Sequence, residues 1–111
     1  MKNCLVYLSG PIAEYNGNSV RVNCEKAIAV YFELIHNDIP AFCPHFTALF
    51  PNDIDYGKWM EYDIAVIDRC THMLMLEDWQ FSKGAVQEFK FANEYGMPVY
   101  YSIEDLLKAL T

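Results

Sequence analysis

Short runs of hydrophobic residues alternate along the chain with longer stretches in which hydrophobic residues recur every three or four positions. The short runs cover residues 4–8, 39–43, 72–77 and 98–101, and runs of this length predict buried β-strands. The longer stretches predict helices at about 19–37, 57–70, 82–95 and 102–110. The first of these helices has one apolar face, made of Cys24, Ala27, Ile28, Tyr31, Leu34 and Ile35.

The residues at the ends of these segments fit the predicted boundaries. Ser82 and Ser102 are of the type that caps a helix N-terminus, and Gly96 is of the type that follows a helix C-terminus. Asn37 interrupts the first helical pattern. Pro40 has no N–H group, so the strand at 39–43 should lie at a sheet edge or have the proline at its start.

Strands that alternate with helices in this order predict an α/β fold, with helices on both faces of a parallel sheet. We expect a single domain over residues 1–111, with a Rossmann-like or flavodoxin-like three-layer arrangement and about four or five parallel strands. Ligands of such sheets bind beyond the carboxyl ends of the strands, where the strand order reverses. The turns at 9–12 and 82–84 each follow a predicted strand and are the candidate ligand loops.

Residues 44–56 form the long segment without a clear period, and we expect it to be irregular. Loops of this length often bind ligands, so this segment is a candidate for substrate specificity. Phe46 and Phe50 within it, and Tyr15 outside it, could stack on a base. Packing in the core or a subunit contact explains these aromatic residues equally well.

The charge of the chain narrows the class of partner. With 15 acidic and 8 basic residues, the net charge of −7 argues against binding to nucleic acid or to an anionic membrane surface. A small anionic ligand stays open, because backbone N–H groups can hold a phosphate without a basic patch. We see no signal peptide and no run that reaches the ~18 apolar residues of a membrane helix, so we expect a cytoplasmic protein.

The cysteines and histidines are scattered rather than paired. No Cys-x-x-Cys motif and no Cys/His cluster with zinc-site spacing occurs, so we expect buried thiols and neither a metal nor another cofactor. The residues concerned are Cys4, Cys24, Cys43, Cys70, His36, His45 and His72.

Tyr7, Asp63 and Glu88 are the candidate catalytic side chains. Tyr7 stands near the end of the first strand, Glu88 lies inside the helix after Ser82, and Asp63 lies beside apolar positions of the preceding helix. A carboxylate beside an apolar face is partly desolvated, which raises its pKa. Two carboxylates in different surroundings can then divide the roles of nucleophile and acid. Each residue also has a plain explanation: a solvated carboxylate, a core tyrosine or, for Ser82, a helix cap.

Two segments resemble a known family. Residues 7–12, Tyr-Leu-Ser-Gly-Pro-Ile, resemble the Y-L-A/S-G-P start of the nucleoside 2-deoxyribosyltransferase-like family, which includes the nucleoside 5′-monophosphate N-glycosidases. Residues 82–88, Ser-Lys-Gly-Ala-Val-Gln-Glu, resemble the later Ser/Asp-x-G-x-x-x-E segment of the same family. An acidic residue on a helix between the two motifs completes the resemblance, which spans the whole chain.

The resemblance implies a role for each matching residue. Glu88 would be the nucleophile that attacks the anomeric carbon of the sugar, and Tyr7 would orient it. Asp63 would be the general acid or base near the leaving base, with Asp68 as the alternative. The pocket that holds the sugar, base and phosphate would be lined by Ser9, Gly10, Pro11, Ile12, Ser82 and Gly84.

The residue at position 82 bears on the substrate. The family's transferases carry Asp there to hold the sugar 5′-hydroxyl, whereas its monophosphate hydrolases carry Ser, which can bond a phosphate without repelling it. We therefore expect hydrolysis of the N-glycosidic bond of a (deoxy)nucleoside 5′-monophosphate, with release of free base and sugar phosphate. The alternatives are a nucleoside 2-deoxyribosyltransferase and a non-catalytic nucleotide-binding or sensing module. The resemblance also implies a homodimer or a higher homo-oligomer.

Overall fold

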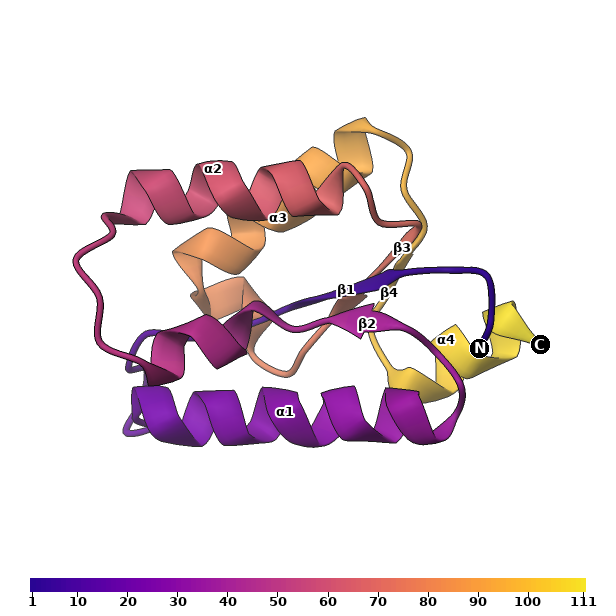
Figure 1. Cartoon of the computed structure of the whole chain (residues 1–111), viewed down its shortest axis with the longest axis horizontal. Helices are drawn as coiled ribbons and strands as arrows, with labels where there is room; N and C mark the ends of the chain where they lie inside the picture. The colour runs from indigo at the N-terminus through magenta and orange to yellow at the C-terminus, as the bar shows by residue number, and fades with distance from the viewer.

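A computed structural model, which describes all 111 residues, contains one sheet of four parallel strands in the order β2-β1-β3-β4 (Figure 1). The strands are β1 (Val6–Ser9), β2 (Ala41–Phe42), β3 (His72–Met75) and β4 (Val99–Tyr100). The helices are α1 (Val20–His36), α2 (Tyr56–Ile67), α3 (Lys83–Glu94) and α4 (Ile103–Leu110), with short 3-10 helices η1 (Pro44–Leu49) and η2 (Trp79–Phe81). The predicted α/β fold with a parallel sheet is confirmed.

The sheet separates two hydrophobic cores, with α1 and α4 on one face and α2 and α3 on the other (Figure 1). Successive side chains of a strand point to opposite faces. Val6 and Leu8 of β1 therefore enter the core beneath α1 and α4, whereas Tyr7 enters the core beneath α2 and α3. All four residues of β1 are buried, as expected for a central strand of a parallel sheet.

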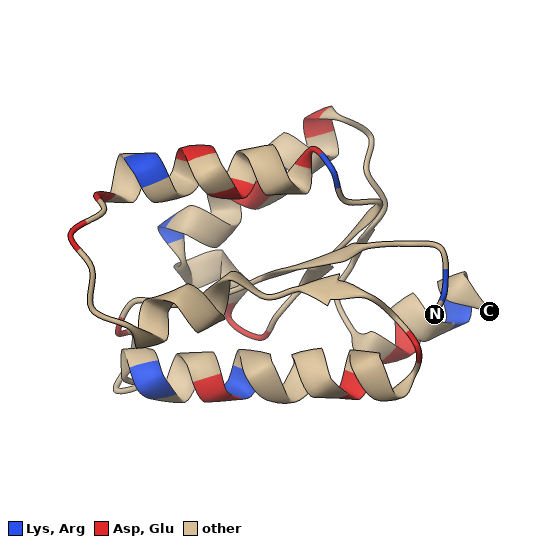
Figure 2. Ribbon diagram, in the orientation of Figure 1, with Lys and Arg blue, Asp and Glu red and all other residues tan.

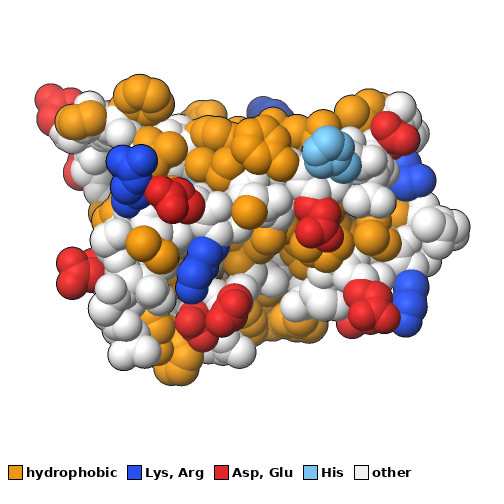
Figure 3. Space-filling model, turned by 90° about the horizontal axis from the view of Figure 1, so that it is seen from below, with side chains coloured by type: hydrophobic (Ala, Val, Ile, Leu, Met, Phe, Trp, Pro, Cys, Tyr) orange, Lys and Arg blue, Asp and Glu red, His pale blue; other side chains and the backbone are white.

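Charged residues are spread over all four α-helices and the chain turns, with both signs interspersed (Figure 2). The α1 side of the molecule likewise shows acidic and basic groups scattered among hydrophobic ones (Figure 3). The two ion pairs, Arg21–Glu25 and Lys108–Glu104, are exposed and contribute little to stability. Stability therefore comes from the two cores.

None of the helices is long and apolar enough to cross a membrane.

The structure corrects several of the predicted segments, and the strands predicted at 39–43 and 98–101 are shortened to β2 and β4. Residues 44–56 are not irregular throughout, because 44–49 form η1, in which the Thr47 hydroxyl donates a hydrogen bond to the Pro44 carbonyl at 2.8 Å. The strand predicted at 72–77 ends at Met75. The prediction for Pro40 is confirmed: β2 begins directly after it and lies at an edge of the sheet.

The order of the strands reverses beside β1, which has β2 on one side and β3 on the other. At the carboxyl ends of β1 and β3, the Leu76 N–H donates to the Ser9 carbonyl at 2.8 Å and holds the two chains together. A Cβ atom on Gly10 would lie 2.7 Å from the Cβ of Leu76, which is too close. Glycine is therefore required where the chain leaves β1.

We predict that Gly10→Ala lowers the free energy of unfolding by about 1–3 kcal/mol, because the new methyl group meets a Cβ atom that cannot rotate away. Denaturant unfolding measures the effect. Gly84→Ala is the matched control, because its Cβ would make ordinary contacts of 3.6 Å with the Met60 sulfur and the Tyr56 hydroxyl. The control should be neutral or stabilising by up to about 1 kcal/mol. Equal effects of the two substitutions would contradict the packing argument.

Candidate active site

Glu88 is a buried carboxylate that accepts hydrogen bonds from two hydroxyl groups. It lies on α3 and is 5 % exposed. The Tyr7 hydroxyl donates to Oε2 at 2.9 Å, and the Ser9 hydroxyl donates to Oε1 at 2.7 Å. Because Tyr7 and Ser9 are two residues apart in β1, their side chains leave the same face of the sheet, toward α3. Glu88 is therefore not a solvated surface residue.

Asp63 of α2 is a second buried carboxyl group beside Glu88, with 8 % of its surface exposed. Burial is the main cause that raises the pKa of Glu88; the charge of Asp63 adds to it, whereas hydrogen bonds from Ser9 and Tyr7 lower it. Burial also raises the pKa of Asp63, as its apolar neighbours suggested. The pair therefore holds a proton at a pH where ordinary carboxyl groups are fully ionised, and it can present one carboxylate and one acid together.

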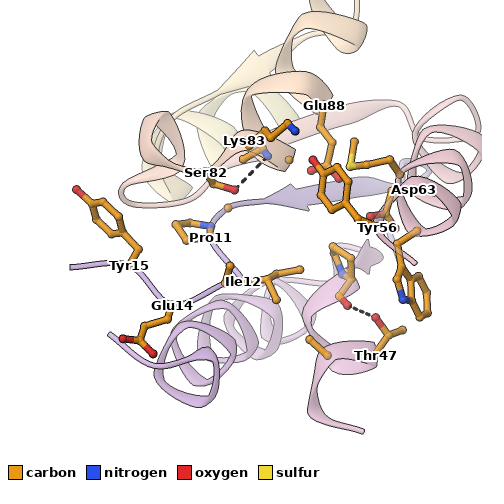
Figure 4. Close-up of a pocket in the computed structure, with 18 of the residues that line it drawn as sticks. Pro11, Ile12, Glu14, Tyr15, Thr47, Tyr56, Asp63, Ser82, Lys83 and Glu88 are labelled. Atoms are coloured by element: carbon orange, nitrogen blue, oxygen red, sulfur yellow. Dashed lines mark hydrogen bonds between the residues drawn. The ribbon is translucent and has the colours of Figure 1, made fainter. Parts of the chain in front are cut away.

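The two carboxyl groups line one end of a pocket of about 480 Å³, a size typical of small-molecule sites. The walls of the pocket come from the loop after β1, from η1, from the first half of α2 and from the start of α3. Figure 4 shows Glu88 and Asp63 at one end beside Tyr56, and Tyr15 with Glu14 at the opposite end. The pocket lies beyond the carboxyl ends of β1 and β3, where the strand order reverses.

The start of α3 provides the part of the pocket that suits an anion. Ser82 caps the helix, with its hydroxyl oxygen accepting a hydrogen bond from the Ala85 N–H at 3.2 Å. The N–H groups of Lys83 and Gly84 belong to the first turn and have no acceptor in the chain. Lys83 is the one basic side chain that lines the pocket, and its Nζ lies 5.4 Å from the centre of the Tyr56 ring. Free N–H groups and a cation together favour a negatively charged group here.

The structure brings most of the predicted site residues together. Gly10, Pro11, Ile12, Ser82 and Gly84 line the pocket with Asp63 and Glu88. One residue has a different place from the one expected: Ser9 does not line the pocket, because it is fully buried and bonds Glu88 instead. Tyr7 is equally buried behind Glu88 and donates a hydrogen bond to it, which fits the expected role of orienting Glu88.

Three other predicted residues lie outside the pocket. Asp68 is at the far end of α2, beside Ile67 and Cys70, so it is not an alternative to Asp63. Phe46 packs edge-on against Tyr31, and Phe50 is 71 % exposed. Of the aromatic residues suggested for base stacking, only Tyr15 lines the pocket.

Several lining residues were not recognised from the sequence. Trp59 and Tyr56 lie at the start of α2, and Phe81 lies on η2, where it stacks on Tyr15 with ring centres 4.9 Å apart. The Trp59 indole N–H donates to the Asn52 side chain at 3.3 Å, which holds the ring at the pocket wall. The position of Trp59 one turn before Asp63 was the available signal, since residues four apart share a helix face.

We predict that Glu88→Gln stabilises the protein increasingly as the pH rises. A folded-state pKa above the unfolded value means that folding favours the protonated, neutral form of Glu88. This contribution to stability is fully present below the unfolded pKa and is lost as the pH rises through the folded pKa. Gln is neutral at every pH. The free energy of unfolding of the variant should therefore exceed that of the wild type by on the order of 1–3 kcal/mol at pH 8, and by much less at pH 5. Denaturant unfolding at several pH values checks this, and a pH-independent difference would contradict it.

Comparison with known proteins places the chain in a family. No curated protein sequence and no solved structure matches it. Residues 4–101 match the family model DUF4406, described as a domain of unknown function. The matched segment runs from the start of the first predicted strand past β4, and it contains the whole pocket. The chain belongs to the DUF4406 family.

Proposed function

We propose that the protein hydrolyses the N-glycosidic bond of a (deoxy)nucleoside 5′-monophosphate, with Glu88 as nucleophile. The observation that carries the proposal is the buried Glu88 carboxylate, held by Tyr7 and Ser9 at one end of a pocket of about 480 Å³. A binding module gains nothing from burying an acid that has only hydroxyl partners, since the burial costs stability. The resemblance of residues 7–12 and 82–88 to the nucleoside 2-deoxyribosyltransferase-like family supports the same reading.

In the first step, a carboxylate oxygen of Glu88 attacks the anomeric carbon as the bond from that carbon to the base nitrogen breaks. Because the two carboxyl groups share one proton, the form of the pair that reacts is the one in which Asp63 holds the proton and Glu88 is ionised. The electron pair of the broken bond stays on the base, and Asp63 supplies the proton that neutralises it. The transition state has oxocarbenium character, which a nearby carboxylate stabilises. Tyr7 and Ser9 fix both oxygens of Glu88, so one orientation of the carboxylate is ready before the substrate arrives.

In the second step, water attacks the same carbon and releases the sugar from Glu88. The Asp63 carboxylate, which lost its proton in the first step, accepts the proton of that water. The products are free base and sugar phosphate, and both carboxyl groups return to their starting state. A second base in place of the water would make the reaction a transfer, so the entry of water decides between hydrolase and transferase.

The groups at the start of α3 favour a substrate that carries a phosphate on its 5′ carbon, away from the base. Ser82 is neutral, so it does not repel a phosphate as an aspartate would. The N–H groups of Lys83 and Gly84 and the Lys83 ammonium group all belong to the start of α3, which lines the pocket. These groups neutralise a 5′-phosphate, whereas a free 5′-hydroxyl needs none of them.

We predict that the wild type releases free base from at least one member of a panel of ribo- and deoxyribonucleoside 5′-monophosphates, detected by chromatography. Glu88→Ala should reduce release to the background rate, because it removes the attacking oxygen. Glu94→Ala is the matched control, since it removes an exposed carboxylate from the same helix. Tight nucleotide binding without release by the wild type would instead identify a binding module.

We predict that Ser82→Asp shifts the preference from monophosphates toward free nucleosides. Asp caps helices as well as Ser does, so α3 should remain intact. The added charge repels a phosphate and can accept a hydrogen bond from a 5′-hydroxyl, so kcat/KM for the monophosphate should fall by about ten- to a hundredfold. Base release or base exchange measured on matched nucleotide and nucleoside pairs gives the ratio. An unchanged ratio would show that position 82 does not contact this end of the substrate.

A further inference from the structure

Two buried polar side chains other than those of Glu88, Asp63 and Ser9 hold the loop that follows β1. His45 of η1 is fully buried, and its Nε2 lies 3.1 Å from the Pro11 carbonyl oxygen. Asn23 of α1 is 7 % exposed, and its Nδ2 donates to the carbonyls of Ile12 at 3.3 Å and Ala13 at 2.9 Å. Three successive carbonyl groups of the loop are therefore bound by side chains rather than by regular secondary structure.

The partners of His45 fix its tautomer. A carbonyl oxygen can only accept, so Nε2 carries the proton that it donates to Pro11, and Nδ1 is left as the acceptor for the Cys43 thiol at 3.6 Å. Burial lowers the pKa of His45 to about 4, while hydrogen bonds to the Pro11 and Gly10 backbone act against this shift. His45 is therefore neutral, and its Nε2–H group donates a hydrogen bond to the loop.

The direction of these carbonyls determines the direction of the N–H groups between them. No peptide bond in the chain is cis, and in a trans peptide the C=O of one residue and the N–H of the next point to opposite sides. With the carbonyls of Pro11, Ile12 and Ala13 drawn toward His45 and Asn23, the N–H groups of Ile12, Ala13 and Glu14 point the other way. These N–H groups have no acceptor in the chain, and all three residues line the pocket.

We propose that His45 and Asn23 are positioning residues of the pocket: they hold the loop carbonyls so that its free N–H groups face the phosphate of the substrate. In Figure 4, Pro11 and Ile12 lie opposite Ser82 and Lys83, so the loop and the start of α3 approach the same part of the pocket from two sides. Neither side chain lines the pocket. The inference rests on the proposed function for the identity of the anion, although the orientation of the loop does not depend on it.

The test compares binding of inorganic phosphate and steady-state kinetics in four proteins: wild type, His45→Gln, His45→Met and Asn23→Leu. Gln can place an amide donor near the position of Nε2, whereas Met fills a similar volume without a donor. Leu likewise replaces Asn23 without its amide. Losing the donor to the loop should raise the Kd for phosphate and the KM for the nucleotide by about tenfold, with kcat changed by less than about threefold. His45→Gln should stay close to the wild type.

A purely structural role gives a different pattern, in which His45→Gln and His45→Met weaken phosphate binding equally or kcat falls while KM is unchanged. Either pattern would overturn the inference, as would a wild type that binds no phosphate. If His45→Met fails to fold, Asn23→Leu tests the same point, because it also removes a donor to the loop carbonyls and is compared with the wild type in the same assays. If no base is released from any nucleotide but phosphate binding follows the predicted order, the proposed function fails and the positioning role stands.

Discussion

The burial of Glu88 is the constraint on which the rest of the site depends. A carboxylate removed from water needs donors, and β1 supplies two of them from alternate positions, the hydroxyls of Tyr7 and Ser9. These bonds require α3 to lie over one face of β1, while Val6 and Leu8 must fill the core on the other face. One strand of four residues thus positions the candidate nucleophile and also joins both cores of the protein.

The same burial gives the site its chemistry. Removing water from Glu88 and Asp63 raises the pKa of each, so the pair can keep a proton that exposed carboxyl groups would lose. The net charge of the chain is −7, yet the start of α3 lines the pocket with free backbone N–H groups and with Lys83, the one basic side chain there. The pocket therefore combines two carboxyl groups with groups that attract an anion, which suits a ligand that has both a phosphate and a leaving group.

The alternation of strands and helices could be predicted from the chain because burial on both faces leaves a continuous apolar run in each strand. The boundaries of β2 and β4 could not, since pairing with a single neighbour limits each to two residues. Glu88 and Asp63 were identified as candidates, but spacing gave no sign that Ser9 bonds Glu88 across 79 positions. The roles of His45 and Asn23 were likewise hidden, because their carbonyl partners lie in a loop that only the folded chain brings near.

The most direct test of the central claim, that Glu88 is a nucleophile, is to look for the bond that it forms. A substrate monophosphate with fluorine at the sugar 2′ carbon destabilises the oxocarbenium-like transition states and slows release of the sugar from the enzyme. Intact-mass measurement should then show the protein heavier by one fluorinated sugar phosphate, with one equivalent of base released and the added mass on the peptide that contains Glu88. Continued base release with no added mass, or added mass on a different residue, would contradict the account.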